Sequence, residues 1–199
     1  MTMTTTTTKT KKKTNTANTQ TAIPDLPPNP FIFEVLELAS KQRTNSKKVE
    51  VLKKYEDPSI KSIFIWNFDE SVITLLPPGD VPYASTDEQT SYSGTLSEKI
   101  NDAVSKMSEL SSSSLGSSDQ GRSSIRSEYR MFYNFIKGGN DSLSSLRRET
   151  MFINILQGLH PKEAEILVLV KDKRLTDKYK ISFELVKESY PDITWGNRS

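Results

Sequence analysis

The apolar residues of this chain fall into two blocks, about 31–83 and 125–195, where they recur at intervals of three and four. That spacing places apolar side chains on one face of an α-helix, and few segments show the alternation expected of a strand. The intervals between the periodic segments are short. The pattern predicts an all-α fold of about seven helices. We expect the two blocks to share one core, because each alone is small for a stable domain.

Local signals indicate where several helices begin. The first block predicts a helix near 31–43 and a second over 47–56. A third should begin at Pro58, because Asp57 before it is a typical N-cap and proline is favoured in the first turn.

The second block is the more regularly patterned one. Tyr129 and Tyr133 are spaced as neighbours on the core face of one helix, and another helix should begin at Pro161. Glu163 would lie in the first turn of that helix, where the helix dipole favours a carboxylate. Leu167 falls on its apolar face and is predicted to be buried.

Two segments differ in composition from the blocks. Residues 1–30 are rich in threonine, lysine and proline, which predicts a disordered tail or, as the alternative, a basic arm that touches phosphates. Residues 84–124 are rich in serine and predict a flexible insertion, within which 96–110 has helical spacing. The folded domain is therefore expected to span 31–195.

Composition indicates the cellular compartment of the protein but does not identify a binding partner. The net charge is only +2, so overall charge does not indicate nucleic acid. The chain has no cysteine, which excludes disulfides and thiolate metal sites and fits a reducing compartment. The apolar runs are too short to span a bilayer, and the N-terminus lacks the apolar region of a secretory signal. We expect a cytoplasmic protein that is not secreted and has no membrane partner.

The sequence contains no set of residues that predicts an enzyme. His160 is the only histidine, and its place between a helix-ending glycine and Pro161 favours a cap or surface role over that of a base. No glycine-rich phosphate loop and no nucleophile-elbow motif occurs. The prediction is a non-enzymatic protein with no catalytic residue, no cofactor and no metal site.

Basic side chains gather at three turns between the predicted helices. The candidate DNA-binding residues are Lys41, Arg43, Lys47 and Lys48 in the first turn, Arg147 and Arg148 in the second, and Lys171, Lys173, Arg174, Lys178 and Lys180 in the third. Cations also complement the negative end of a helix, so each cluster alone is explained as a solvated helix end. Together they are typical of a helical domain that straddles a phosphate backbone, with Tyr179 against a sugar or capping the helix behind it.

The stretches "FEVLELASKQRTNSKKVEVLKKYEDPSIKSIFIWNFDE" and "RRETMFINILQGLHPKEAEILVLVKDKRLTDKYKISFELVKESYPDI" share apolar spacing and polar landmarks with a known domain. They resemble the N-terminal DNA-binding domain of phage-type ATP-dependent DNA ligases. The resemblance places Leu175 in a turn that, in those ligases, lies against the DNA backbone across the minor groove. It implies contact with duplex DNA. The glycine of that turn is missing here, and no K-x-D-G nucleotidyl-transfer motif occurs, so ligation is not implied.

The elements "LPPGDVPY", "YNFIKGGN" and "KDKRLTDKY" also look like a set of proteins encoded by T4-like tailed phages, especially marine ones. This resemblance implies a phage origin and the cytoplasm of a bacterial host.

Two functions remain open from the sequence. The first is a DNA-binding accessory protein of a phage that contacts duplex phosphates with weak sequence specificity and steep salt dependence. It predicts the three basic clusters on one face. The second is a protein–protein adaptor in a phage replication, transcription or assembly complex. It predicts dispersed clusters and an exposed apolar surface, for which Ile65, Trp66 and Trp195 are candidates.

Overall fold

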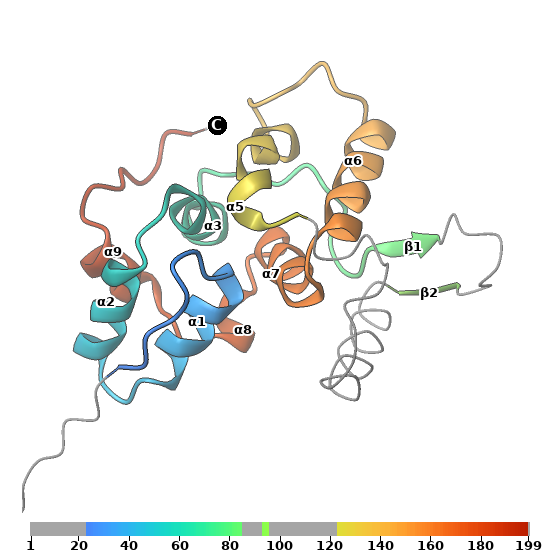
Figure 1. Cartoon of the computed structure of the whole chain (residues 1–199). Helices are drawn as coiled ribbons and strands as arrows, with labels where there is room; N and C mark the ends of the chain where they lie inside the picture. The colour runs from blue at the N-terminus through green and yellow to red at the C-terminus, as the bar shows by residue number, and fades with distance from the viewer. Residues whose placement is uncertain (1–22, 85–92, 96–122, 199) are drawn as a thin grey trace, which may run out of the picture.

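The computed structural model describes residues 23–84, 93–95 and 123–198. In these residues the chain is helical, which confirms the all-α class (Figure 1). The helices of the first half are α1 (Ile32–Lys41), α2 (Asn45–Lys54) and α3 (Pro58–Phe68). The second half contains α5 (Ile125–Glu128), the 3-10 helix η1 (Tyr129–Phe135), α6 (Ser145–Gly158), α7 (Pro161–Lys171), α8 (Leu175–Lys178) and α9 (Phe183–Ser189). Two short strands, β1 (Pro82–Ala84) and β2 (Ser93–Thr95), pair antiparallel.

α7 is the central helix of the fold. It packs against α1, α3, α6 and α8, and its residues Ile166, Leu167 and Val170 are fully buried. A helix surrounded by others needs apolar residues on most of its surface, and α7 has them after its first turn. Buried side chains from both halves of the chain form one cluster around it. The predicted shared core and the predicted burial of Leu167 are both confirmed.

Glu163, in the first turn of α7, joins the beginnings of two other helices. Its side chain is fully buried, and its carboxylate accepts the backbone N–H groups of Ile32 (2.8 Å) and Ile125 (2.7 Å), the first residues of α1 and α5. Burial raises the pKa of Glu163, whereas these two hydrogen bonds act to lower it. The first N–H groups of a helix lack acceptors within the helix. The Glu163 side chain therefore provides an acceptor for one such N–H group in each of two helices.

Two local expectations need correction. α2 begins at Asn45, two residues earlier than expected, because Thr44 is its N-cap and accepts the Lys47 N–H. The segment around Tyr129 is not one regular α-helix but α5 followed by η1. A 3-10 helix has three residues per turn, so residues four apart do not share a face. Tyr133 accordingly points outward, with 48% of its surface exposed.

Residues 23–30, assigned from the sequence to the tail, run along the folded domain. Ile23 and Leu26 pack against the core, and the Leu26 N–H donates to the Tyr55 hydroxyl over 2.8 Å. Two apolar residues in a proline-rich run are too weak a pattern to predict this. Residues 1–22 and the helix expected at 96–110 lie outside the described residues.

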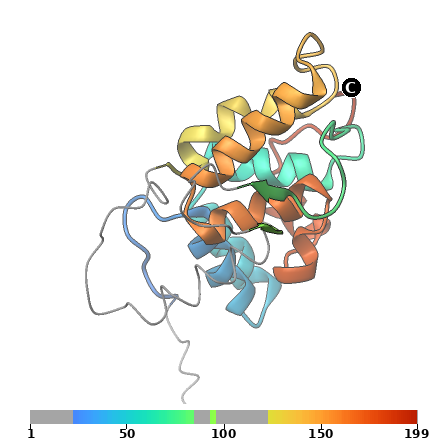
Figure 2. The ribbon, with the colours of Figure 1, turned by 90° about the vertical axis from the view of Figure 1, so that its right-hand side faces the viewer.

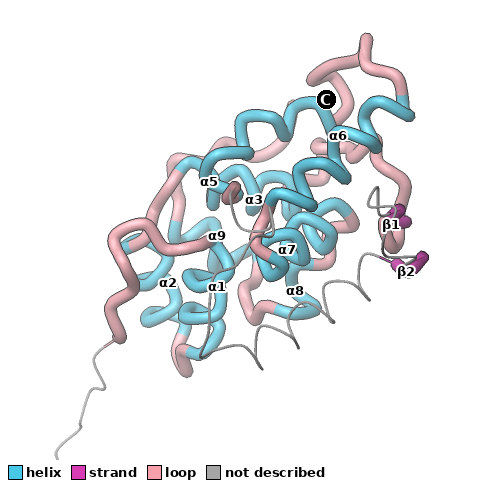
Figure 3. The backbone as a smooth tube through the Cα atoms, turned by 45° about the vertical axis from the view of Figure 1, so that its right-hand side comes forward, coloured by secondary structure: helices cyan, strands magenta, loops and turns pink. Residues whose placement is uncertain are grey.

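The helices divide between the two ends of the molecule. α1, α2 and α8 lie at one end, and α5, η1 and α6 lie at the other, with α7 between them (Figures 1, 2 and 3). The chain reaches the start of α6 by a loop at the far end from α1 and α2 (Figures 1 and 3). This separation decides which basic clusters can act together.

Candidate nucleic-acid interface

The first basic stretch forms the turn between α1 and α2. Residues 41–48 contain four cations and no carboxylate. Lys41 and Arg43 are exposed, and the Lys41 ammonium lies 3.9 Å from the Glu37 carboxylate in a surface pair that contributes little to stability. α1 ends and α2 begins at this turn, so the negative end of one helix dipole offsets the positive end of the other, and the local charge comes from the side chains.

Part of the third basic stretch lies against this turn. The Lys48 ammonium donates to the carbonyl oxygen of Lys180 over 2.5 Å, although the two residues are 132 positions apart. An ammonium has three N–H donors, so two remain for another acceptor. The Lys180 side chain is exposed, and Lys178 forms an ion pair with Glu165 of α7. We call the resulting set the basic turn surface; its members are Lys41, Arg43, Lys47, Lys48, Lys178 and Lys180.

Lys171 does not belong to this surface. Its side chain is 1% exposed, its ammonium donates to the carbonyl oxygens of Pro77 and Gly79 over 2.8 Å each, and it pairs with Asp172 at 2.7 Å. The expectation that Lys171 contacts phosphate is corrected, because its charge is enclosed and all three N–H donors are occupied. Lys171 instead holds the loop after α3 against the central helix.

The middle of the third stretch also differs from expectation. Lys173 has a φ of 58° and donates from its ammonium to the carbonyl oxygen of Asp69, and burial lowers its pKa. Arg174 is exposed and pairs with Asp177 at 2.7 Å. Tyr179 is 2% exposed, so its ring is part of the core and does not lie against a sugar. The five cations of residues 171–180 therefore do not form one charged face.

The two arginines of the Arg147–Arg148 cluster also lie in different environments, one buried and one exposed. Arg148 is 5% exposed, and its guanidinium donates to the carbonyl oxygens of Asn134 (2.7 Å), Asn140 and Leu143 (both 3.0 Å). Its assignment as a DNA contact is corrected, since the side chain is committed to the loop between η1 and α6. Arg147 is exposed but lies in the first turn of α6, at the end of the molecule opposite α1 and α2 (Figures 1 and 3). The three clusters do not share a face.

The three candidates for the exposed apolar surface of an adaptor are buried or partly buried, and Ile65 packs against the core. Trp66 is 2% exposed, and its indole N–H donates to the Thr74 hydroxyl over 2.9 Å. Trp195 is partly buried, with its ring edge-on to Phe183 at 4.8 Å between centroids. The large apolar side chains most exposed in the described residues are Ile73, Met131, Tyr133 and Leu146.

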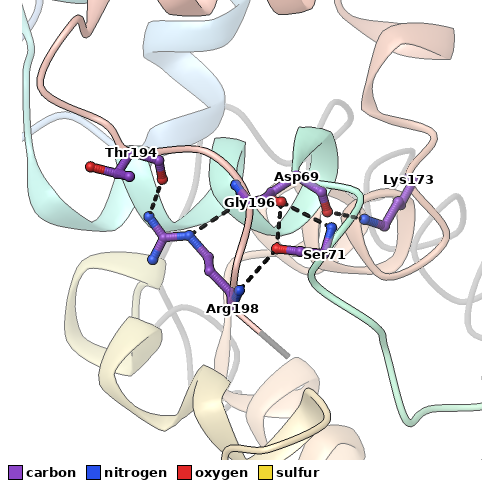
Figure 4. Close-up of polar contacts among 6 residues, drawn as sticks. All are labelled: Asp69, Ser71, Lys173, Thr194, Gly196 and Arg198. Atoms are coloured by element: carbon purple, nitrogen blue, oxygen red, sulfur yellow. Dashed lines mark hydrogen bonds and ion pairs between the residues drawn. The ribbon is translucent and has the colours of Figure 1, made fainter.

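A buried carboxylate that was not predicted from the sequence lies at the end of α3. The buried Asp69 carboxylate accepts the backbone N–H and hydroxyl of Ser71 (2.9 and 2.7 Å), the N–H of Gly196 (2.9 Å) and the Arg198 Nε–H (3.1 Å) (Figure 4). Burial acts to raise the pKa of Asp69, but these hydrogen bonds together hold it below its usual value. Arg198 also donates to the Thr194 carbonyl, so residues 194–198 are fastened to α3. We call this the C-terminal clasp.

Across the described residues, no group of three or more His, Asp or Glu side chains is placed to hold a metal ion. None of the helices in this part of the chain is long and apolar enough to cross a membrane.

Comparison with known proteins gives one match. The model of a family of unknown function (DUF6433) matches residues 35–107 and 112–177. The chain belongs to this family. The matched residues include the whole α1–α2 turn and end just before Lys178. No curated protein and no solved structure matches the chain.

Proposed function

We propose that this protein is a non-enzymatic DNA-binding accessory protein that contacts the phosphate backbone through the basic turn surface. The observation that supports this most is the hydrogen bond from Lys48 to the Lys180 carbonyl, because it joins two cationic stretches 132 positions apart. The carboxylates near them, Glu37 and Glu165, form partly exposed ion pairs. Such pairs are weak, so their cations can exchange a carboxylate for a phosphate at little cost.

The chemistry of this surface indicates how the protein would bind. Ammonium and guanidinium groups on phosphates fix position and supply affinity without reading bases, so sequence preference should be weak. Each neutralised phosphate releases counterions, so affinity should fall steeply with salt. The preference for duplex DNA, the phage origin and the host cytoplasm rest on the resemblances in the sequence and are part of the same proposal.

A matched pair of double variants tests the proposal. Lys48→Ala with Lys180→Ala removes two charges from the basic turn surface, whereas Lys137→Ala with Arg147→Ala removes two exposed charges at the other end. Duplex affinity is measured by fluorescence anisotropy on two unrelated sequences at low salt. The first double variant should bind both duplexes several-fold more weakly than wild type, and the second should bind within about twofold of wild type, since it removes no contact.

Equal losses in the two double variants would mean that overall charge, and not this surface, determines binding. Binding of wild type to neither duplex would reject the DNA proposal altogether.

The adaptor role remains the second candidate because of two observations. The basic clusters are dispersed, as that role predicts, since Arg147 lies in the first turn of α6 and not beside the α1–α2 turn. The other observation is an exposed apolar groove. Leu146, in the first turn of α6, is 76% exposed and lines a groove with Leu143, Met131 and Met151. Exposed apolar surface of this kind is typical of protein contacts. The adaptor becomes the preferred function if the lysine variants bind DNA as wild type does.

A further inference from the structure

A second groove lies between α3 and η1. It has a volume of about 550 Å³, which falls in the range of small-molecule sites. Its walls include Trp66 and Ile65 from α3, and Tyr129 and Tyr133 from η1. Tyr133 is 48% exposed, so a large part of its ring is open to a ligand. The groove therefore presents the ring of Tyr133, which is not part of the core.

The C-terminal clasp builds one border of this groove. Asn197 and Arg198 line it, and Arg198 is held in place by Asp69 and by the Thr194 carbonyl (Figure 4). The Arg198 charge is thus largely balanced by the Asp69 carboxylate at 3.1 Å. A border fixed by several hydrogen bonds is preorganised, which reduces the entropy lost when a ligand binds.

The charge of the groove is positive. Arg130 lines it, is exposed, and has its guanidinium carbon 5.9 Å from the centre of the Tyr129 ring. None of the described residues that line the groove is acidic. A ligand that matches both features is planar, so that it can stack on a tyrosine, and anionic, so that it can pair with Arg130.

We propose that this groove binds a nucleobase of a single-stranded nucleic acid, stacked on the ring of Tyr133, with an adjacent phosphate at Arg130. Stacking on an aromatic ring suits any base, so the site is sequence-tolerant. A partner helix would instead need a continuous apolar stripe, and here Arg130, Ser62 and Asn197 interrupt it. The inference rests on the proposed DNA binding and adds that the protein also engages unpaired strands.

The two sites can be tested separately because they involve different elements. The basic turn surface is built by α1, α2 and the segment after α7, whereas the groove is built by α3, η1 and the C-terminus. A strand in the groove and a duplex on the basic turn surface would therefore be bound independently.

The experiment compares affinities for a short labelled oligothymidylate and for a labelled duplex. Tyr133→Ala should weaken single-strand binding by about 5- to 150-fold, the loss expected when one base loses its stacking partner. Duplex affinity should stay within about twofold, because backbone contacts elsewhere are unchanged. Tyr133→Phe keeps the ring and should bind single strands nearly as wild type does.

Met131→Ala is the matched control. Met131 is on the same 3-10 helix, is 37% exposed, and lines the other groove, beside α6. It should change neither affinity. Thermal melts of all variants show whether a loss of binding reflects a loss of folding.

Three results would overturn the inference. The first is a Tyr133→Ala variant whose affinity for the single strand stays within about twofold of wild type, because loss of stacking should weaken binding by more than twofold. Another is an equal loss on single strand and duplex, which would indicate a general defect. The third is that the wild-type protein binds the duplex but not the oligothymidylate. This result would reject the single-strand site in the groove without contradicting the proposed function. The lysine variants decide that function independently.

Discussion

The stretches 41–48 and 171–180 look alike as sequences, yet the fold uses their cations differently. The first is a turn between two helices at one end of the molecule, and Lys41 and Arg43 remain exposed there. The second begins at Lys171, the last residue of the central helix, and the loop after α3 packs against this residue and encloses it. The local density of positive charge in the sequence does not show which lysines face solvent. The exposure of each lysine depends on where its turn lies relative to the core.

The enclosed cations share one structural role. Lys171 and Arg148 each hold an irregular loop by donating to two or three backbone carbonyl groups. A loop that packs inside the protein has carbonyl groups without helical partners, and burying them unpaired costs free energy. A long side chain with several N–H donors can satisfy them together.

The largest effect is expected from Arg148, compared with its exposed neighbour. Arg148→Met keeps an apolar stem but leaves three carbonyl groups without their donor, so the free energy of unfolding should fall by about 3 kcal/mol. Arg147→Met should change it by less than about 0.5 kcal/mol, as is usual for surface positions. Urea unfolding measures both. Similar values for the two variants would contradict the assignment of Arg148 as a structural residue.

Lys171 and Lys180 give the same comparison within the third stretch. Lys171→Met removes the donor to the Pro77 and Gly79 carbonyl groups and the ion pair with Asp172, so a loss of about 2 kcal/mol is expected. Lys180→Met should leave stability nearly unchanged and should instead weaken duplex binding. The account fails here if Lys171→Met unfolds at the same urea concentration as wild type but binds DNA more weakly.

A smaller effect should appear in the pH dependence. The folded-state pKa of Asp69 is lowered, so its ionised form contributes stability that is present above its unfolded pKa of about 3.9 and is lost as pH falls through the folded value. Wild type should therefore lose more stability than Asp69→Asn between neutral pH and about pH 3. Urea unfolding at several pH values measures this. Equal losses would show that the C-terminal clasp contributes nothing through this carboxylate.

The smallest effect should come from His160. Burial, with a contribution from Lys162, lowers the pKa of this imidazole, and its Nδ1 accepts the Lys162 N–H as the cap of α7. Stability should therefore decline as pH falls below the unfolded pKa of about 6.5, because the unfolded state binds the proton more readily. His160→Asn retains a capping side chain and should flatten the profile between pH 5 and 7. A wild-type profile that is already flat in that range would contradict this.

Local sequence signals correctly predicted those features of the fold that depend on residues close together in the chain. The start of α3 at Pro58, the start of α7 at Pro161 and the burial of Leu167 follow from capping residues and helical spacing. Contacts between distant residues could not be predicted in this way. The bonds that enclose Lys171 join residues more than 90 positions apart, and Asp69 meets Arg198 across 129 positions.

The prediction that Tyr133 lies on the core face of a helix was wrong for a different reason. Its spacing of four from Tyr129 indicates a shared face only in an α-helix, and this segment is a 3-10 helix. The groove that this ring lines was therefore missed.

The central claim is that the basic turn surface contacts phosphates, and the salt dependence of duplex binding tests it most directly. Wild type is compared with a triple variant, Arg43→Ala, Lys48→Ala and Lys180→Ala, over a series of salt concentrations. If each of these cations neutralises one phosphate, the slope of log K against log salt should become shallower by about 2.7, or roughly 0.9 per contact. The loss should be the same on unrelated duplexes. A wild-type affinity that does not depend on salt, or a triple variant with the wild-type slope, would contradict the account.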